Sequence, residues 1–202
     1  MLFFIKWNGS MFDDKYDQKC REHAAKVTET IDVINYLLDK NPALNNMNVK
    51  VKRTTETEIK FVEMQWESMS ERRAGWSWRA VLGKKKKKIM RLALSICSNG
   101  QVYGMLFCTG SRHGLNVNIR YLEGDPNKWH PLKSFILDIA LEAAEQYAEK
   151  LNAKMLTIQS PVPELVDTYR DKGYDYNQKD RRRYNKGLSV FCKTLEKVIR
   201  NG

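Results

Sequence analysis

Three side chains in the second half of the chain have the chemistry to move protons. Glu123 ends a predicted strand, where its carboxylate would accept a proton directly or through a water molecule. Tyr169 ends a predicted short helix, and a phenol with a pKa of about 10 can protonate a leaving group of comparable basicity. Ser160 ends a second predicted strand, where its hydroxyl could bind a substrate or relay a proton. Each has a structural alternative: a solvent-facing glutamate, a core tyrosine, and a serine that caps the turn before Pro161.

The elements that would position these side chains form one continuous stretch. An apolar strand at 115–122 breaks and is followed by a basic loop. A long amphipathic helix then begins at Pro131, since proline suits the first helical position, and leads into a second strand at 154–158. A short helix at 163–169 closes with Gly173 as its C′ residue. Two strands joined by a helical crossover must lie parallel, and such sheets usually bind ligands at the carboxyl ends of their strands.

The rest of the chain alternates helix and strand signals. Asn99-Gly100 is a hairpin turn signal, and Thr55 with Glu58 forms a capping-box pattern at a helix start. The aromatic connector 76–82 takes no assignment. The other predicted elements are a helix at 13–40, a strand at 48–54, a helix from Thr55 to about residue 73, strands at 89–97 and 102–109, and a closing antiparallel hairpin at 174–186 and 188–195 with a basic cluster at its turn.

This order of elements, with Tyr169, Gly173 and Tyr174 spaced as Tyr-x-x-x-Gly-aromatic, resembles the GNAT-superfamily N-acetyltransferases over residues 48–195. The resemblance implies an α/β (α+β) fold with a mixed, mostly antiparallel central sheet flanked by helices. It also implies transfer of an acetyl group from acetyl-CoA directly to an amine. Residues 48–202 would form the acyltransferase domain, and residues 1–47 an extra N-terminal helix packed on it.

The resemblance also implies where acetyl-CoA would bind. Members splay their fourth and fifth strands so that the pantetheine arm pairs with the fourth, here near Leu122 and Gly124. Their phosphate loop reads Arg or Gln, two residues, Gly, one residue, then Gly or Ala. The aligned residues here keep a cation first but replace both small positions by proline and lysine; the implied cofactor-binding residues are Lys128, Trp129, His130, Leu132 and Lys133. Tyr169 matches the tyrosine that protonates the departing thiolate.

The formal net charge of +11 favours anionic partners. Basic residues concentrate at Lys84–Lys88 and around Arg181–Arg183, which predict contact with a nucleic acid or an acidic protein, or a solvated surface as the alternative. The acceptor is accordingly expected to be anionic or macromolecular. Two other functions stay open: a GNAT-like enzyme that modifies nucleic acid, and a basic binding protein that kept the fold without catalysis.

Composition excludes other classes of protein. No window approaches the roughly 18 apolar residues of a membrane span, so we expect no membrane contact and a cytoplasmic location. The four cysteines are scattered without metal-ligand spacing, which predicts reduced thiols and no metal centre. Trp66, Trp76 and Trp78 are expected in the core, with an acceptor pocket or a homodimer contact as alternatives.

Overall fold

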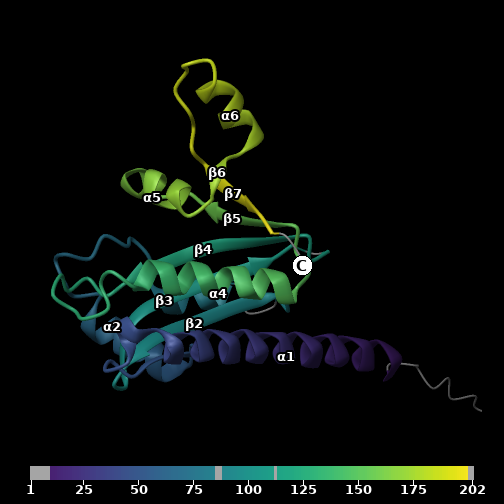
Figure 1. The fold of residues 1–202 in the computed structure, drawn as a ribbon. Helices are drawn as coiled ribbons and strands as arrows, with labels where there is room; N and C mark the ends of the chain where they lie inside the picture. The colour runs from purple at the N-terminus through teal and green to yellow at the C-terminus, as the bar shows by residue number, and fades with distance from the viewer. Residues whose placement is uncertain (1–9, 85–87, 112, 200–202) are drawn as a thin grey trace, which may run out of the picture.

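A computed structural model describes residues 10–84, 88–111 and 113–199. Within these residues the chain forms one sheet with helices on both of its faces (Figure 1). The helices are α1 Ser10–Lys40, α2 Glu56–Gln65, α3 Trp78–Lys84, α4 Ile136–Lys150, α5 Val166–Asp171 and α6 Gln178–Tyr184, with short 3-10 turns at Pro42–Leu44 and Pro163–Leu165. The strands are β1 Val49–Arg53, β2 Arg91–Ser98, β3 Gln101–Gly110, β4 Asn116–Gly124, β5 Met155–Gln159, β6 Asp175–Tyr176 and β7 Thr194–Val198.

The sheet is mixed and mostly antiparallel, as the sequence predicted. Its strand order is β1-β2-β3-β4-β5-β7-β6. Only β4 and β5 pair in parallel, because α4 carries the chain back across the sheet between them. The β2–β3 hairpin turns at Asn99 and Gly100, with φ of +48° and +83°, the positive values that this dipeptide accepts.

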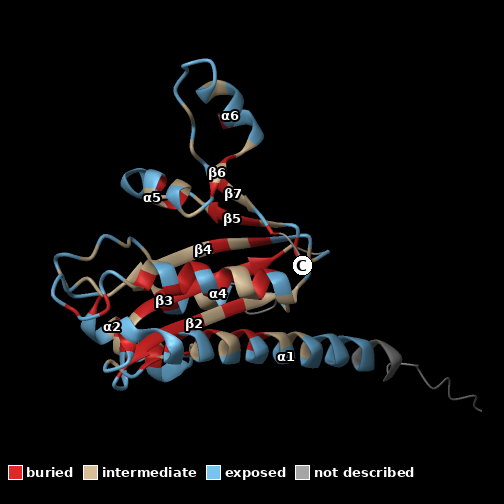
Figure 2. Cartoon of the chain, viewed as in Figure 1, coloured by how far each residue is buried: buried red, intermediate tan, exposed pale blue. Residues whose placement is uncertain are grey.

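Each face of the sheet has its own apolar core. On one face, α1 and α4 pack against alternate residues of the strands, with Leu94 and Leu106 fully buried among them. On the other face, α2 and α3 place Trp66 and Trp78 against Phe107, the strand neighbour of Leu106 that points the opposite way. Figure 2 shows the strands largely buried, whereas α6 and the N-terminal part of α1 are mostly exposed.

The outer edge of β1 is covered by a side chain of α1. The Asn35 amide lies beside Val51, donates to its carbonyl at 3.0 Å and accepts from its N–H at 2.7 Å. The amide thus takes the place of a neighbouring strand and satisfies backbone groups that an open edge would expose. Among the described helices, none is long and apolar enough to cross a membrane.

Three predicted elements differ from the structure. The helix predicted from Thr55 to about residue 73 ends at Gln65, with Trp66 as its C-cap. The helix expected from Pro131 begins at Ile136, because residues 131–135 form turns in which the N–H groups of Phe135 and Ile136 both bond to the Leu132 carbonyl. The last two strands pair in antiparallel as predicted, but their bounds are wrong: β6 has two residues, β7 begins at Thr194, and the basic cluster lies on α6. The Asn177 side chain caps that helix by accepting from the N–H three residues on, so the chain follows a helical path where a strand was expected.

Candidate functional site

The strands β4 and β5 separate at their carboxyl ends. Their parallel pairing stops at Ile119 and Ile158, although β4 continues for five residues to Gly124. Beyond Ile119, β4 is paired only with β3 among the described residues, so its backbone groups on the β5 side are free. A cavity of about 280 Å³ opens at this fork; it is lined by Trp76, Ile119, Arg120, Tyr121, Leu122, Ile158, Gln159, Ser160, Pro161, Val162 and Tyr169. We call this cavity the cleft.

A β-bulge in β4 stands at the fork. Tyr121 lies opposite Phe107 of β3, and Ile119 lies opposite the next β3 residue, Cys108. Arg120 is therefore an extra residue without a partner in the ladder. Bulges bend a strand and increase its twist, which accounts for β4 turning away from β5 immediately after this position.

A polar network ties the base of the fork together. The Arg120 guanidinium donates to Gln159 Oε1 at 2.8 Å and to Thr109 Oγ1 at 3.3 Å. Asn118 Oδ1 accepts from Gln159 Nε2 at 3.0 Å and from Thr157 Oγ1 at 2.7 Å. These bonds join β3, β4 and β5 just below the cleft, so the divergence is held in place. The sequence analysis missed Arg120, whose only signal is a charge inside an apolar strand.

Tyr169 reaches the cleft from α5. Its ring is 6% exposed and meets the ring of Tyr174 edge-on, at 6.3 Å between centroids. The helix ends as predicted: Gly173 has a φ of +86°, and the Tyr174 N–H bonds back to the Tyr169 carbonyl. Burial raises the pKa of the Tyr169 phenol above its ordinary value. The phenol is therefore protonated at neutral pH, which is the state that a proton donor needs.

Ser160 lies where β5 ends, at the junction of two cavities. Its φ of +50° is in the left-handed region, and its N–H donates to the Lys193 carbonyl at 2.9 Å. Ser160 and Pro161 line the cleft and also a second cavity of about 590 Å³ between α5 and the loop before β7. The side chain of Ser160 is exposed to both spaces.

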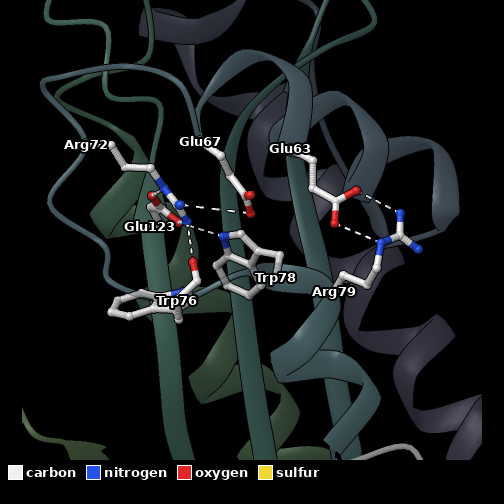
Figure 3. A network of polar contacts seen from close by, with 7 residues as sticks. All are labelled: Glu63, Glu67, Arg72, Trp76, Trp78, Arg79 and Glu123. Atoms are coloured by element: carbon white, nitrogen blue, oxygen red, sulfur yellow. Dashed lines mark hydrogen bonds and ion pairs between the residues drawn. The ribbon is translucent and has the colours of Figure 1, made fainter.

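Glu123 is engaged by Arg72 and by Trp78 at the start of α3 (Figure 3). Arg72 donates to both carboxylate oxygens, from Nε at 2.7 Å and from Nη2 at 3.2 Å, and Trp78 Nε1 donates at 2.6 Å. The side chains of Glu123 and Arg72 are only 8% and 9% exposed. Glu123 does not line the cleft as the described residues form it. The geometry gives this carboxylate a place in a buried ion pair, and its role as a base stays a prediction.

Two glycines allow α4 to approach the sheet closely. Gly124 lies opposite Gly104 of β3, and both face the first turn of α4. A Cβ atom on Gly104 would lie 2.9 Å from Cγ2 of Ile136, closer than side chains tolerate. Gly124, predicted near the cofactor, thus lies under the start of α4. It follows Leu122, which lines the cleft, by two residues on β4.

The start of α4 has both bonded and free amides. In the turns before α4 and at its first residue, the N–H groups of Lys133, Phe135 and Ile136 bond to the chain itself. Free amides with no acceptor among the described residues include those of Leu132 and Ser134, and those of Leu137 and Asp138 in the first turn of the helix. The Leu132 side chain is fully buried, so only its backbone faces a ligand. Free amides at a helix N-terminus are donors that a phosphate can use.

The other predicted loop residues divide by exposure. Lys128 and Lys133 are exposed and free to act as point charges, and Trp129 is 91% exposed. His130 is buried and stacked on Tyr103, with ring centroids 5.4 Å apart. Burial lowers the pKa of His130, so the ring is neutral at pH 7 and adds no charge toward a phosphate.

The structure thus brings some of the predicted site together. Leu122, Ser160 and Tyr169 share the cleft, whereas Glu123 does not line it and is bound by Arg72 and Trp78. Of the two basic clusters, Lys85–Lys87 lie outside the described residues, and Arg181–Arg183 lie on α6.

No protein-family model and no curated protein sequence matches the chain. Solved structures match its fold. One is the ribosomal-protein-S18-alanine N-acetyltransferase from Escherichia coli, with a TM-score of 0.53, 11% identity, and coverage of 75% of this chain and 94% of that one. Another is the PaiA N-acetyltransferase from Thermoplasma acidophilum, in complex with coenzyme A, with a TM-score of 0.50, 14% identity, and coverage of 75% and 99%.

A third match is N-acetylglutamate synthase from Neisseria gonorrhoeae, solved with coenzyme A and N-acetyl-glutamate. The TM-score is 0.52 and the identity 13%; the match covers 75% of this chain and only 35% of the synthase. At these identities the likeness concerns the fold. With the element order and the diverging β4 and β5, it confirms the prediction that this chain has the GNAT acetyltransferase fold.

Proposed function

We propose that the protein is an N-acyltransferase that transfers an acetyl group from acetyl-CoA to a primary amine. The observation that carries the proposal is the fork between β4 and β5, where a cleft with free strand backbone has a protonated tyrosine in its wall. A closed sheet would leave neither a slot for a thioester arm nor a proton donor beside it.

Two sets of groups in the chain would bind the two ends of acetyl-CoA: strand backbone for the pantetheine arm, and amides with lysines for the phosphates. The free backbone groups of β4 beyond Ile119 can pair with the amides of the pantetheine arm, as a further strand would. The phosphates would meet the amides of Leu132 and Ser134, with Lys128 and Lys133 supplying charge in place of the missing glycine-rich backbone. When bound, acetyl-CoA supplies the activated acyl group as a thioester.

Tyr169 supplies the proton that the leaving sulfur needs. The amine nitrogen attacks the thioester carbonyl carbon, the carbon–sulfur bond breaks, the amine loses one proton and the sulfur gains one. The buried phenol, kept protonated by its raised pKa, lies in the wall of the cleft where the sulfur would leave.

The missing base restricts the acceptor. No residue lining the described cleft is acidic, and Glu123 is held by Arg72 and Trp78. An α-amine, with a pKa of about 7.7–8.0, is roughly one-quarter to two-fifths neutral at pH 7.5, whereas about one lysine side chain in a thousand is neutral there. We therefore expect α-amine acceptors. The E. coli enzyme, named for an alanine substrate, is consistent with such an acceptor.

Calorimetry and a thiol-release assay test the proposal. Acetyl-CoA should bind with measurable heat, and a peptide with a free α-amine should release coenzyme A at pH 7.5 at least tenfold faster than an Nα-blocked lysine peptide. Tyr169→Phe should keep binding and lose about 100-fold in kcat. Tyr174→Phe is the matched control, because that phenol is buried, unpartnered among the described residues and outside the cleft.

A binding protein without catalysis is the second candidate, favoured by Pro131 and Lys133 at the two small positions of the phosphate loop. Binding of acetyl-CoA without turnover of any amine would support that candidate. No heat at millimolar acetyl-CoA would overturn the transferase proposal outright.

A further inference from the structure

A helical projection at the far edge of the sheet has no part in the proposed chemistry. We call residues 175–193, which include α6 and the loop after it, the α6 arm; Figure 1 shows it standing beyond the sheet edge next to β6 and β7. Its base is held by Asp180, which is 1% exposed and accepts from the N–H groups of Phe191 at 2.9 Å and Cys192 at 3.0 Å. These buried hydrogen bonds give the arm a defined structure.

The arm carries a concentrated positive charge. Between residues 177 and 193 the sequence has six lysines and arginines and one acid, the buried Asp180. Lys179 and Arg182 lie three residues apart on one side of α6, and Lys186 follows in the turn after it. All three are exposed and have no acidic partner among the described residues. Nothing in the described fold neutralises this side, so it is complementary to an anionic partner.

Exposed apolar groups lie among these cations. Phe191, Tyr184 and Leu188 are 54%, 51% and 51% exposed. Lys179 Nζ lies 5.0 Å from the centre of the Phe191 ring, and the guanidinium of Arg183 lies 4.5 Å from it. A flat ring framed by cations is the arrangement that binds unpaired bases by stacking while the cations hold the phosphates.

We propose that the α6 arm binds single-stranded RNA segments through phosphate contacts and base stacking. An acidic protein surface would use the cations but would leave the exposed rings without a matching function. Duplex DNA would hide its bases from those rings, whereas RNA presents unpaired bases in its loops and ends. The binding site is separate from the acetyl-CoA cleft and does not depend on the proposed function.

The arm also borders the second cavity. Val190, Phe191, Cys192 and Lys193 form one wall of the 590 Å³ space, and Ser160 connects that space with the cleft. An RNA held by the arm therefore lies beside the entrance of the cleft.

Fluorescence anisotropy with a fluorescein-labelled 20-nucleotide unstructured RNA tests the proposal. The charge-reversed variant Lys179→Glu/Arg182→Glu/Lys186→Glu should bind at least tenfold more weakly at 100 mM KCl. Losing three phosphate contacts should also reduce the slope of log K against log salt by about 2. The matched control reverses Lys15, Lys19 and Arg21 on the exposed part of α1 and so has the same net charge.

Further arms of the experiment separate the alternatives. A charge-preserving variant, Lys179→Arg/Arg182→Lys/Lys186→Arg, should bind like wild type, and ultraviolet crosslinking should attach the RNA to peptides from residues 178–193. Equal losses in the arm and α1 variants would show that only net charge matters and would overturn the site. Tighter binding of duplex DNA than of the RNA, or no RNA binding at 50 mM KCl, would overturn the assignment to single-stranded RNA. Acetyl-CoA binding should be unchanged in the arm variant.

Discussion

Replacing Glu123 by alanine should destabilise the protein strongly, because the buried Arg72 guanidinium then keeps only one carboxylate partner among the described residues, Glu67 at 3.9 Å. The Arg72 side chain is 9% exposed, and two of its nitrogens and the indole nitrogen of Trp78 donate to this one carboxylate. Breaking a buried ion pair on one side costs about 3–5 kcal/mol. For a chain of this size each kcal/mol lowers Tm by roughly 2–4 °C, so we expect a fall of about 6–20 °C.

An exposed pair on the same face provides the matched control. Arg79 donates to both oxygens of Glu63 at 2.8 Å, with the same two-point geometry, but these side chains are 47% and 25% exposed. Arg79 also keeps a second partner, Glu56, at 2.6 Å. Glu63→Ala should therefore cost only about 0.2–1 kcal/mol, because water replaces what the carboxylate provided.

Urea unfolding followed by circular dichroism measures both variants and a double-mutant cycle. Arg72→Met combined with Glu123→Ala removes both charges, so the double variant should cost at least about 2 kcal/mol less than the sum of the single variants. If Glu123→Ala costs no more than Glu63→Ala, the carboxylate is solvated, and the argument that it is unavailable as a base is wrong.

Three further predictions concern stability. Burial, aided by nearby positive charges, lowers the pKa of His23 from 6.5 to about 4, so the stability contributed by its neutral ring is present above pH 6.5 and is lost as pH falls toward 4. Because the side chain is only half-buried, solvent screening reduces the expected loss to about 1 kcal/mol at pH 4.5. His23→Gln, which keeps a polar partner for Tyr147, should flatten that part of a urea-unfolding pH series, and an unchanged slope would contradict the prediction. Gly104→Val should cost about 1–3 kcal/mol in thermal unfolding by pressing on Ile136, and a gain in Tm would refute the close packing. Asn35→Ala should cost about 2 kcal/mol in urea unfolding and speed amide exchange at the edge of β1; protection equal to wild type would show that the amide is dispensable.

The parts of the fold that depend on local signals could be predicted from the sequence. Three local features were predictable: the β5 strand, the Asn99-Gly100 turn and the helix end at Gly173. Each depends on residues adjacent in the sequence, either through a run of apolar residues or through residue types that accept a positive φ. The fork between β4 and β5 followed from the resemblance rather than from the residues. The bulge at Arg120 that accompanies it has no local signature.

The features that the sequence could not predict depend on distant contacts. Arg72 lies 51 residues from Glu123 in the sequence, so the residues around either one give no signal that the carboxylate is paired. The segment of the α6 arm was predicted as a hairpin with the basic cluster at its turn. Its helix is fixed by the Asn177 cap and by Asp180, which accepts from backbone N–H groups eleven and twelve residues away.

Two residues with strained backbone line the larger of the two cavities. Five non-glycine residues have a positive φ, and three of them are asparagines, which tolerate that region at little cost. The other two, Ser160 and Cys192, have φ of +50° and +49°, and both line the 590 Å³ cavity. Left-handed backbone costs such residues about 1–2 kcal/mol and persists only where the surroundings impose it. Backbone strain thus occurs on two walls of one cavity, and the β4 bulge opens the adjoining cleft. This pattern is typical of a site shaped to hold ligands, and it favours a working cleft over a vestigial one.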